Sequence, residues 1–536
     1  MARMVARVAA AALLLTAGAT AADPITSQMR RDDPRLAQRV SLTRPRLYVA
    51  ELLAELSRQT GVELVAGDVG DGAGDEQVTA ILRDVPLADA LDALWSLVSY
   101  RGAEWHWQRL GKEGSYRYRL LRPRAAQLLA AQMRQRIQTD FEAHAAAMLA
   151  GAFADDRTRA KMEARDPALR GLVESERLRA GLRLFAETLP PETRLAVLRR
   201  EARPYVRGSD LSPTGQAFIR FLWDQATRLP TGERLPIPEP TVVFFFVEWF
   251  PNEIAPSLYI MPDGIGGYAY IGGVPYERVW QERIGEEWLL HGDRRNDRAG
   301  TRRIEAPDPP PPPKPEDATP AGRMAQLADA AGISILARLP FHHERDPGAP
   351  FGQTVEQYLA TLTEKLPAYL HKWRRGILVV TYANWFVSEA DLPNVPWELV
   401  QQLREAERRQ DGFLRLDDLV AAAMRLTERQ LLRLAQEFRV MASVAAWRSV
   451  LRVCANSPEN LSRLRSRQGF PIAPVAEAVR ALGHPNLIQC LESGRAVALR
   501  VVEREYPDQR PPERSVMFQL LSERGEVLAA MGFRYQ

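Results

Sequence analysis

The chain has 536 residues, of which 46% are apolar and 26% charged, which is enough to build several hydrophobic cores and excludes a disordered protein. The net charge is only +4, and basic runs are interrupted by acids, as in Arg30-Arg31-Asp32-Asp33, so we expect no nucleic-acid partner. After the first residues no apolar run approaches the roughly 20 residues of a spanning helix, so we do not expect an integral membrane protein.

Residues 1–22 have the three parts of a secretory signal peptide. Arg3 and Arg7 give a charged start, residues 8–19 are a short apolar run, and small residues follow for cleavage near Ala21 or Ala22. The alternative is a disordered cytoplasmic leader, which would not need these parts in this order. We therefore expect a periplasmic or secreted protein.

Residues 40–122 change their hydrophobic period several times, which predicts a small mixed module. Gly61 is expected to cap a first helix and Pro86 to begin a second. The predicted element order is βαββαββ, with strands at 40–42, 62–66, 78–82, 104–109 and 116–120 and helices at 47–59 and 87–98.

This stretch resembles the short N-terminal domain shared by secretins and TonB-dependent receptors. The resemblance rests on residues 52–62 with the helix-ending Gly61, on Val78 and the residues 85–94 that follow it in sequence, and on the closing hairpin. It covers about a sixth of the chain. The resemblance implies a periplasmic interaction module that carries no catalytic residues.

Residues 123–300 are expected to form a helical region followed by a small β-sheet. The helices carry an apolar stripe, and the strands follow them at 242–250, 257–261 and 267–271. The stripe consists of Leu178, Leu182, Phe185 and Leu189. A Pro-rich linker at 301–320 contains five consecutive prolines, which predict an extended polyproline II spacer.

The pattern of the first module recurs, more weakly, in a second diverged module at 321–390, where the family resemblance covers about 319–383. Gly61 and Gly332 occupy like places in the two patterns, as do Leu91 and Leu359. Residues 391–536 again read as a helical region with a C-terminal β-sheet, and Thr427 to Gln430 form a capping box. We therefore predict the α+β class and hypothesise an internal duplication, which unrelated strand orders in the two halves would refute.

Trp105, His106 and Trp107 alternate along one of the expected strands, so the two indoles share a face. Tyr116 and Tyr118 extend that face from the next strand. An exposed face of this kind would bind a sugar or a peptide. The alternative is an ordinary packed face of a sheet.

Other features give no support to catalysis or to a cofactor. His342 and His343 are adjacent in an expected loop and point apart, so we expect no metal site there. The glycine-rich residues 264–273 lack the Lys-Ser/Thr pair of a phosphate-binding loop. Cys454 and Cys490, the two cysteines, either form a disulfide in an oxidising compartment or remain buried thiols.

The sequence therefore predicts an exported, non-enzymatic protein that binds envelope proteins or cell-wall components through sheet edges or the aromatic face. The alternative is an exported hydrolase of an unrecognised family, with its site between a helical region and a small sheet.

Overall fold

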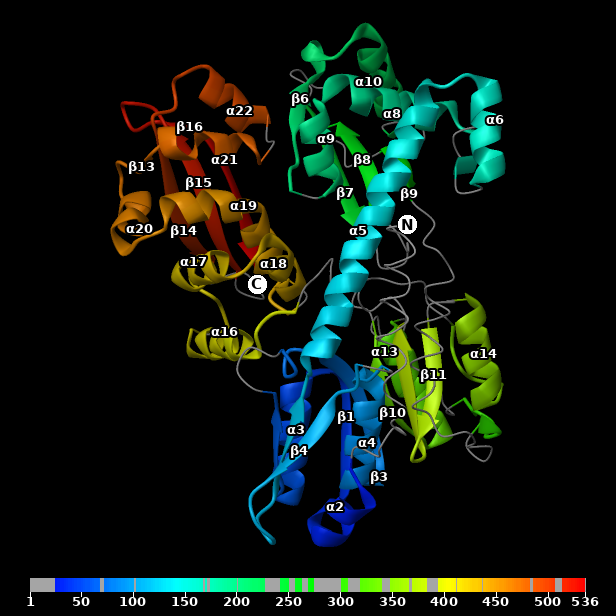
Figure 1. Cartoon of the computed structure of the whole chain (residues 1–536). Helices are drawn as coiled ribbons and strands as arrows, with labels where there is room; N and C mark the ends of the chain where they lie inside the picture. The colour runs from blue at the N-terminus through cyan, green and yellow to red at the C-terminus, as the bar shows by residue number, and fades with distance from the viewer. Residues whose placement is uncertain are drawn as a thin grey trace, which may run out of the picture. The chain divides into compact units, whose positions relative to one another are not determined.

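The computed structural model has the predicted α+β class (Figure 1). The described residues are 25–67, 72–100, 103–166, 169–170, 174–199, 201–226, 242–249, 256–262, 269–273, 300–306, 319–339, 348–365, 369–382, 394–410, 412–435, 437–482, 485–506 and 513–535. The predicted signal peptide and most of the predicted Pro-rich linker lie outside them.

The chain divides into two compact units, one formed by residues 1–130 with 278–385 and the other by residues 131–277 with 386–536. Each unit takes one segment from each half of the chain. The first unit contains the two small modules, and the second contains the two helical regions with their sheets.

The first module has the predicted order βαββαββ. It follows α2 (Ser27–Asp32) and η1 (Pro34–Ala37), and consists of β1 (Arg39–Tyr48), α3 (Val49–Thr60), β2 (Glu63–Ala66), β3 (Gln77–Pro86), α4 (Leu87–Val98), β4 (His106–Leu110) and β5 (Arg117–Leu121). Gly61 ends α3 with a φ of +66°, as predicted for the cap. The strands separate into an antiparallel β1–β3 pair and a three-stranded sheet in the order β2-β5-β4.

The second module repeats part of this topology, with the order αβαββ, so the expectation of a second complete module is wrong for the described residues: an isolated bridge between Arg303 and Thr354 stands where the first module has the β1–β3 pair. It consists of α13 (Pro320–Ala331), β10 (Ser334–Arg338), α14 (Val355–Lys365), β11 (Tyr369–Arg374) and β12 (Ile377–Tyr382). The order β10-β12-β11, with one parallel and one antiparallel pair, matches β2-β5-β4 strand for strand.

Two local details also agree between the modules. Gly332 ends α13 with a φ of +62°, as Gly61 ends α3. The first residue of α14, Val355, donates its N–H to Arg302 O, just as Leu87 at the start of α4 donates to Gln38 O. The strand orders are therefore related, as the duplication hypothesis requires of these two segments.

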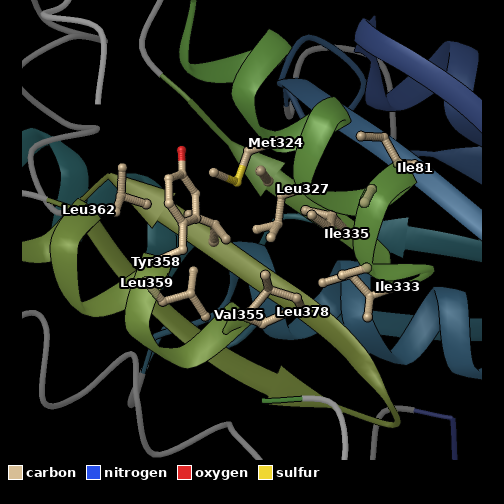
Figure 2. Packing of buried hydrophobic residues seen from close by; sticks show 14 of the residues in the cluster. Ile81, Met324, Leu327, Ile333, Ile335, Val355, Tyr358, Leu359, Leu362 and Leu378 are labelled. Atoms are coloured by element: carbon tan, nitrogen blue, oxygen red, sulfur yellow. The ribbon is translucent and has the colours of Figure 1, made fainter. Parts of the chain in front are cut away.

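The two modules share one sheet, which the sequence did not indicate. Strand β3 pairs antiparallel with β10, giving a five-stranded sheet in the order β1-β3-β10-β12-β11. Figure 2 shows the result on one face, where Ile81 of β3 lies in the core of the second module with Met324 and Leu327 of α13 and Tyr358 of α14. The modules therefore fold as one body.

A side-chain difference distinguishes the edge of β2 from that of β10, which accepts the added strand. In the first module the Leu64 N–H of β2 donates to Ser57 Oγ at 2.9 Å, so this group is not available to another strand. Ser57 O also accepts from the N–H of the capping Gly61, and Ala328 O accepts from the corresponding Gly332. Ala328 has no hydroxyl, and the matching strand residue, Ile335, pairs with Ile81 of β3.

The second unit contains two helical regions with similar sheets. The first has α5 (Arg124–Phe153), α6 (Asp156–Arg165), α8 (Glu176–Thr188), α9 (Pro191–Leu198), β6 (Tyr205–Arg207), η3 (Gly208–Asp210), α10 (Pro213–Ala226), β7 (Val242–Trp249), β8 (Pro256–Pro262) and β9 (Ala269–Gly273). The second has α16 (Trp397–Arg409), α17 (Leu416–Arg425), α18 (Glu428–Leu434), α19 (Val440–Cys454), α20 (Pro458–Arg465), β13 (Phe470–Pro471), η5 (Ala473–Val475), α21 (Ala476–Arg480), α22 (Pro485–Glu492), β14 (Ala498–Tyr506), β15 (Glu513–Leu521) and β16 (Val527–Tyr535).

Both sheets are antiparallel meanders that begin with a very short strand, β6-β7-β8-β9 and β13-β14-β15-β16. Helices α8 and α9 contact β9 and β7, and α19 and α20 contact the corresponding β16 and β14. The predicted stripe of α8 is buried, with Phe185 against Phe245 of β7, and Trp447 of α19 stacks on Phe518 of β15 at 3.8 Å between ring centroids. The capping box of Thr427 and Gln430 is confirmed.

Among the helices of the described residues, none combines the length and the apolar character that a bilayer crossing requires.

We predict that Ser57→Ala lowers the free energy of unfolding by about 1 kcal/mol, because it leaves the Leu64 N–H without its acceptor. Urea unfolding measures this change. Ser115→Ala, which removes an exposed hydroxyl near Lys112 O, should shift the free energy by less than about 0.5 kcal/mol. Equal effects of the two substitutions would show that Ser57 does not protect the β2 edge.

Candidate functional site

The predicted aromatic platform is not exposed. Trp105, Trp107 and Tyr118 are buried, and only Tyr116 is partly accessible. The tryptophans pack on α4, where Trp107 Nε1 donates to Leu91 O at 3.3 Å. The prediction of an aromatic binding face is therefore corrected to its alternative, a packed sheet face, because the apolar surface of α4 covers the indoles.

The two tyrosines are also engaged within the module. The Tyr118 hydroxyl donates to Asp33 Oδ2 at 3.2 Å, and burial together with the Asp33 charge raises the pKa of Tyr118. The Arg109 guanidinium lies 4.5 Å from the centre of the Tyr116 ring, and its Nη1 donates to Asp32 at 2.7 Å. These contacts attach the strands β4 and β5 to the segment before β1.

The candidate disulfide is not formed. Cys454, in the last turn of α19, and Cys490, on α22, are both free thiols. Burial raises the pKa of Cys454 to about 12, so this thiol is held in its unreactive protonated form. Cys454 thus fits the buried-thiol alternative, whereas Cys490 is only partly buried.

Within the ranges that the structure describes, no group of three or more His, Cys, Asp or Glu side chains is close enough together to hold a metal ion. His342 and His343 lie outside those ranges, as does most of the glycine-rich stretch at 264–273.

The sheet edges are the remaining predicted binding feature, and the edge of β1 is blocked. The Gln59 side chain of α3 accepts from Ser41 N at 3.2 Å and donates to Ser41 O at 3.0 Å, as a neighbouring strand would. Farther along, Pro45 interrupts the strand between Arg44 and Arg46. Prolines and basic residues are common protections of an edge against strand addition.

The other edges in the first unit are short or basic. The edge of β2 has four residues and is occupied at Leu64 by Ser57. Strand β4 has five residues, including the ion-paired Arg109. Strand β11 has six residues, and two of them, Lys372 and Arg374, are basic and contact α4. These edges therefore offer little room for an added strand.

The edge of β16 in the second unit differs from all of these. The strand has nine residues, and Val527 to Phe533 contain neither a charge nor a proline. Val527 and Ala530 are exposed. Strand β15 pairs with one side of β16, with a β-bulge at Leu528, and no strand among the described residues pairs with the other side. This uncharged edge is the candidate docking site.

A second conspicuous feature is a set of buried charges between the two modules of the first unit. Asp92, fully buried on α4, accepts from Arg374 Nη2 at 3.1 Å and from Arg375 Nε at 3.2 Å. Arg375 and Gly376 form the two-residue turn between β11 and β12, and both have positive φ. Burial raises the pKa of Asp92, although the two guanidinium groups oppose this shift.

A second buried carboxylate has a similar role. Glu76, directly before β3, is bonded to Arg338 of β10 and lies 3.5 Å from Arg122, which follows β5. All three side chains are nearly inaccessible to water. Each carboxylate thus contacts two arginines and connects the first module to the second.

Lys372 of β11 completes the contacts to α4. Its Nζ donates to Ser96 O at 2.7 Å, one helical turn beyond Asp92. Burial, with a smaller contribution from the positive charge of Arg374, holds the pKa of Lys372 well below its usual value. The cluster orients α4 on the strands of the second module and has the character of a structural contact, because its ionised groups are already engaged with one another.

Sequence reasoning did not identify this cluster. The sequence contains one sign of it, the carboxylate of Asp92 within the apolar helix Leu87–Val98. A charge in such a position requires a partner. Comparisons with known protein families, with curated proteins and with solved structures return no match for this chain.

We predict that Asp92→Asn lowers the free energy of unfolding by about 3–5 kcal/mol, because Arg374 would remain buried without a carboxylate. The matched control is Asp84→Asn, which breaks the exposed ion pair with Arg39 and should cost less than about 1 kcal/mol. Thermal or urea unfolding compares the two variants. A small effect of Asp92→Asn would mean that the arginines reach water without opening the interface.

The lowered pKa of Lys372 predicts a specific pH dependence of the free energy of unfolding. Because its pKa is lower in the folded state, the unfolded chain binds more protons up to about pH 10.5, and the free energy of unfolding rises with pH in that range. Lys372→Met should flatten this rise between neutral and alkaline pH, measured by urea unfolding at several pH values. The exposed Lys112→Met should keep the rise, and an unchanged slope in Lys372→Met would contradict the assignment.

Proposed function

We propose that this protein is an exported, non-enzymatic interaction protein of the cell envelope, which binds its partner by adding a β-strand to the edge of β16. Strand addition supplies affinity through main-chain hydrogen bonds, and it requires an edge whose N–H and C=O groups are unobstructed.

The observation that carries the proposal is the contrast between β16 and the edges of the first unit. Gln59 occupies the edge of β1, and Ser57 occupies the edge of β2. Strand β16 is longer than β2, β4 and β11, and it has no charge from Val527 to Phe533. A long apolar edge promotes association, so a protein that keeps one has a use for it.

Two features of the sequence support an envelope location. Residues 1–22 have the composition of a secretory signal peptide. Residues 40–122 resemble the short N-terminal domain of secretins and TonB-dependent receptors, which implies a periplasmic interaction module. In this proposal the two modules bind each other, and the partner binds the second unit.

Site-specific photo-crosslinking tests the proposal. A photo-reactive amino acid at Leu528 of β16 should crosslink to a protein of the envelope, whereas the same group at the exposed Thr43, on the blocked edge of β1, should not. The crosslink should decrease at least tenfold in the variant Ala530→Lys, because lysine on an edge strand disfavours pairing.

Crosslinking at Leu528 that persists in Ala530→Lys, or that is equally strong at Thr43, would refute docking at the β16 edge. Circular dichroism and the unfolding midpoint of Ala530→Lys should match the parent chain, since Ala530 is exposed.

A further inference from the structure

Residues 25–37, which we call the N-terminal strap, are part of the folded first module although they precede its first strand. The strap contains the helices α2 and η1. Ile25 and Leu36, near its two ends, are fully buried. The strap is therefore built into the module and is not a loose chain end.

Side chains of the strap reach α4 and the closing hairpin of the module. Asp32 of α2 accepts from Arg109 of β4 at 2.7 Å, and Arg30 of α2 donates to Asp89 of α4, also at 2.7 Å. The partners lie 77 and 59 positions apart in the sequence. The strap thus connects the start of the module to the elements that complete it.

Asp33, between the two helices of the strap, makes its most buried polar contacts. The carboxylate accepts from the Tyr118 hydroxyl of β5 at 3.2 Å, and from Nε and Nη2 of Arg35, both at 2.8 Å. Arg35 also donates to Tyr116 O at 2.7 Å. Removal of the Asp33 carboxylate would therefore loosen the strap from β5.

The strap begins directly after the predicted signal peptide. Cleavage near Ala21 or Ala22 places the scissile bond three or four residues before Ile25. An extended chain covers at most about 3.6 Å per residue, so the bond lies within about 14 Å of a fully buried side chain. Helix α2 begins at Ser27, two residues after Ile25.

This short spacing sets cleavage against docking of the strap. A protease binds several residues on each side of the scissile bond in an extended form, so these residues cannot at the same time belong to folded structure. In the docked strap Ile25 is inaccessible, and the chain is helical from Ser27 onward. A signal peptidase therefore needs the strap to be undocked.

We propose that docking of the N-terminal strap and removal of the signal peptide exclude each other, so that the first module completes its fold only after cleavage. A precursor that docks its strap first is protected from the peptidase. This inference rests on the exported location in the proposed function, and it is independent of docking at β16.

Cleavage of the purified full chain by detergent-solubilised signal peptidase tests the inference. Precursor that has folded in the cytoplasm should lose residues 1–22 at least about tenfold more slowly than precursor diluted from urea into the same assay. The physical reason is that cleavage of a folded chain follows the small population of its opened form. Gel electrophoresis and mass spectrometry measure the rate and the site of cleavage.

Loosening the strap should restore cleavage of the folded precursor. Asp33→Ala should accelerate it about tenfold, because the bonds from Tyr118 and Arg35 are lost. Asp32→Asn, which weakens only the partly exposed ion pair with Arg109, should give a smaller acceleration.

The matched control is Ser57→Ala, which destabilises the same module at the β2 edge, outside the strap. This variant should leave the cleavage rate of the folded precursor nearly unchanged, because the strap opens locally. Equal cleavage of folded and urea-diluted precursor, no acceleration by Asp33→Ala, or equal acceleration by Ser57→Ala would overturn the inference.

The inference and the proposed function fail in different ways. If neither the folded nor the urea-diluted precursor is cut, residues 1–22 are not a signal peptide, and both the inference and the exported location are wrong. If cleavage depends on the strap as expected while Leu528 gives no crosslink, docking at β16 is wrong and the inference stands.

Discussion

The antiparallel pairing of β3 with β10 is the contact on which the arrangement of the first unit depends. Strand β3 is already bonded to β1, so this one ladder combines a strand pair and a three-stranded sheet into five strands. It also brings α4 of the first module over strands of the second. The contacts of Asp92 with Arg374 and of Lys372 with Ser96 become possible only in that arrangement.

The two modules share the αβαββ part of their topology but have different edges at β2 and β10. Ser57 satisfies a main-chain group of β2, whereas Ala328, at the same place relative to the capping glycine, leaves that edge available. Since an unpaired main-chain group is costly to bury, the joint forms where no side chain already satisfies the edge. One hydroxyl thus distinguishes the corresponding edges of two similar modules.

Local structure was largely predictable from the sequence, and the partnerships between distant segments were not. Gly61 and Gly332 end their helices as expected, because only a residue without Cβ adopts positive φ there at little cost. Trp105 and Trp107 share a face as the alternation predicts, but alternation cannot tell whether that face meets water or a helix. The joint between β3 and β10 could not be read from the sequence because strand pairing at long range depends on which edges remain unsatisfied.

The edge of β16 presents the same physical problem as the edge of β10, with a different solution. In the first unit, Gln59, Ser57 and the second module satisfy or cover the edges of β1, β2 and β3. In the second unit, the edge of β16 has neither a charge nor a proline from Val527 to Phe533, although a β-bulge at Leu528 interrupts its ladder with β15. Such an edge lowers its free energy by pairing with an added strand. Docking of a partner strand at β16 would therefore follow the same rule that joins the two modules within one chain.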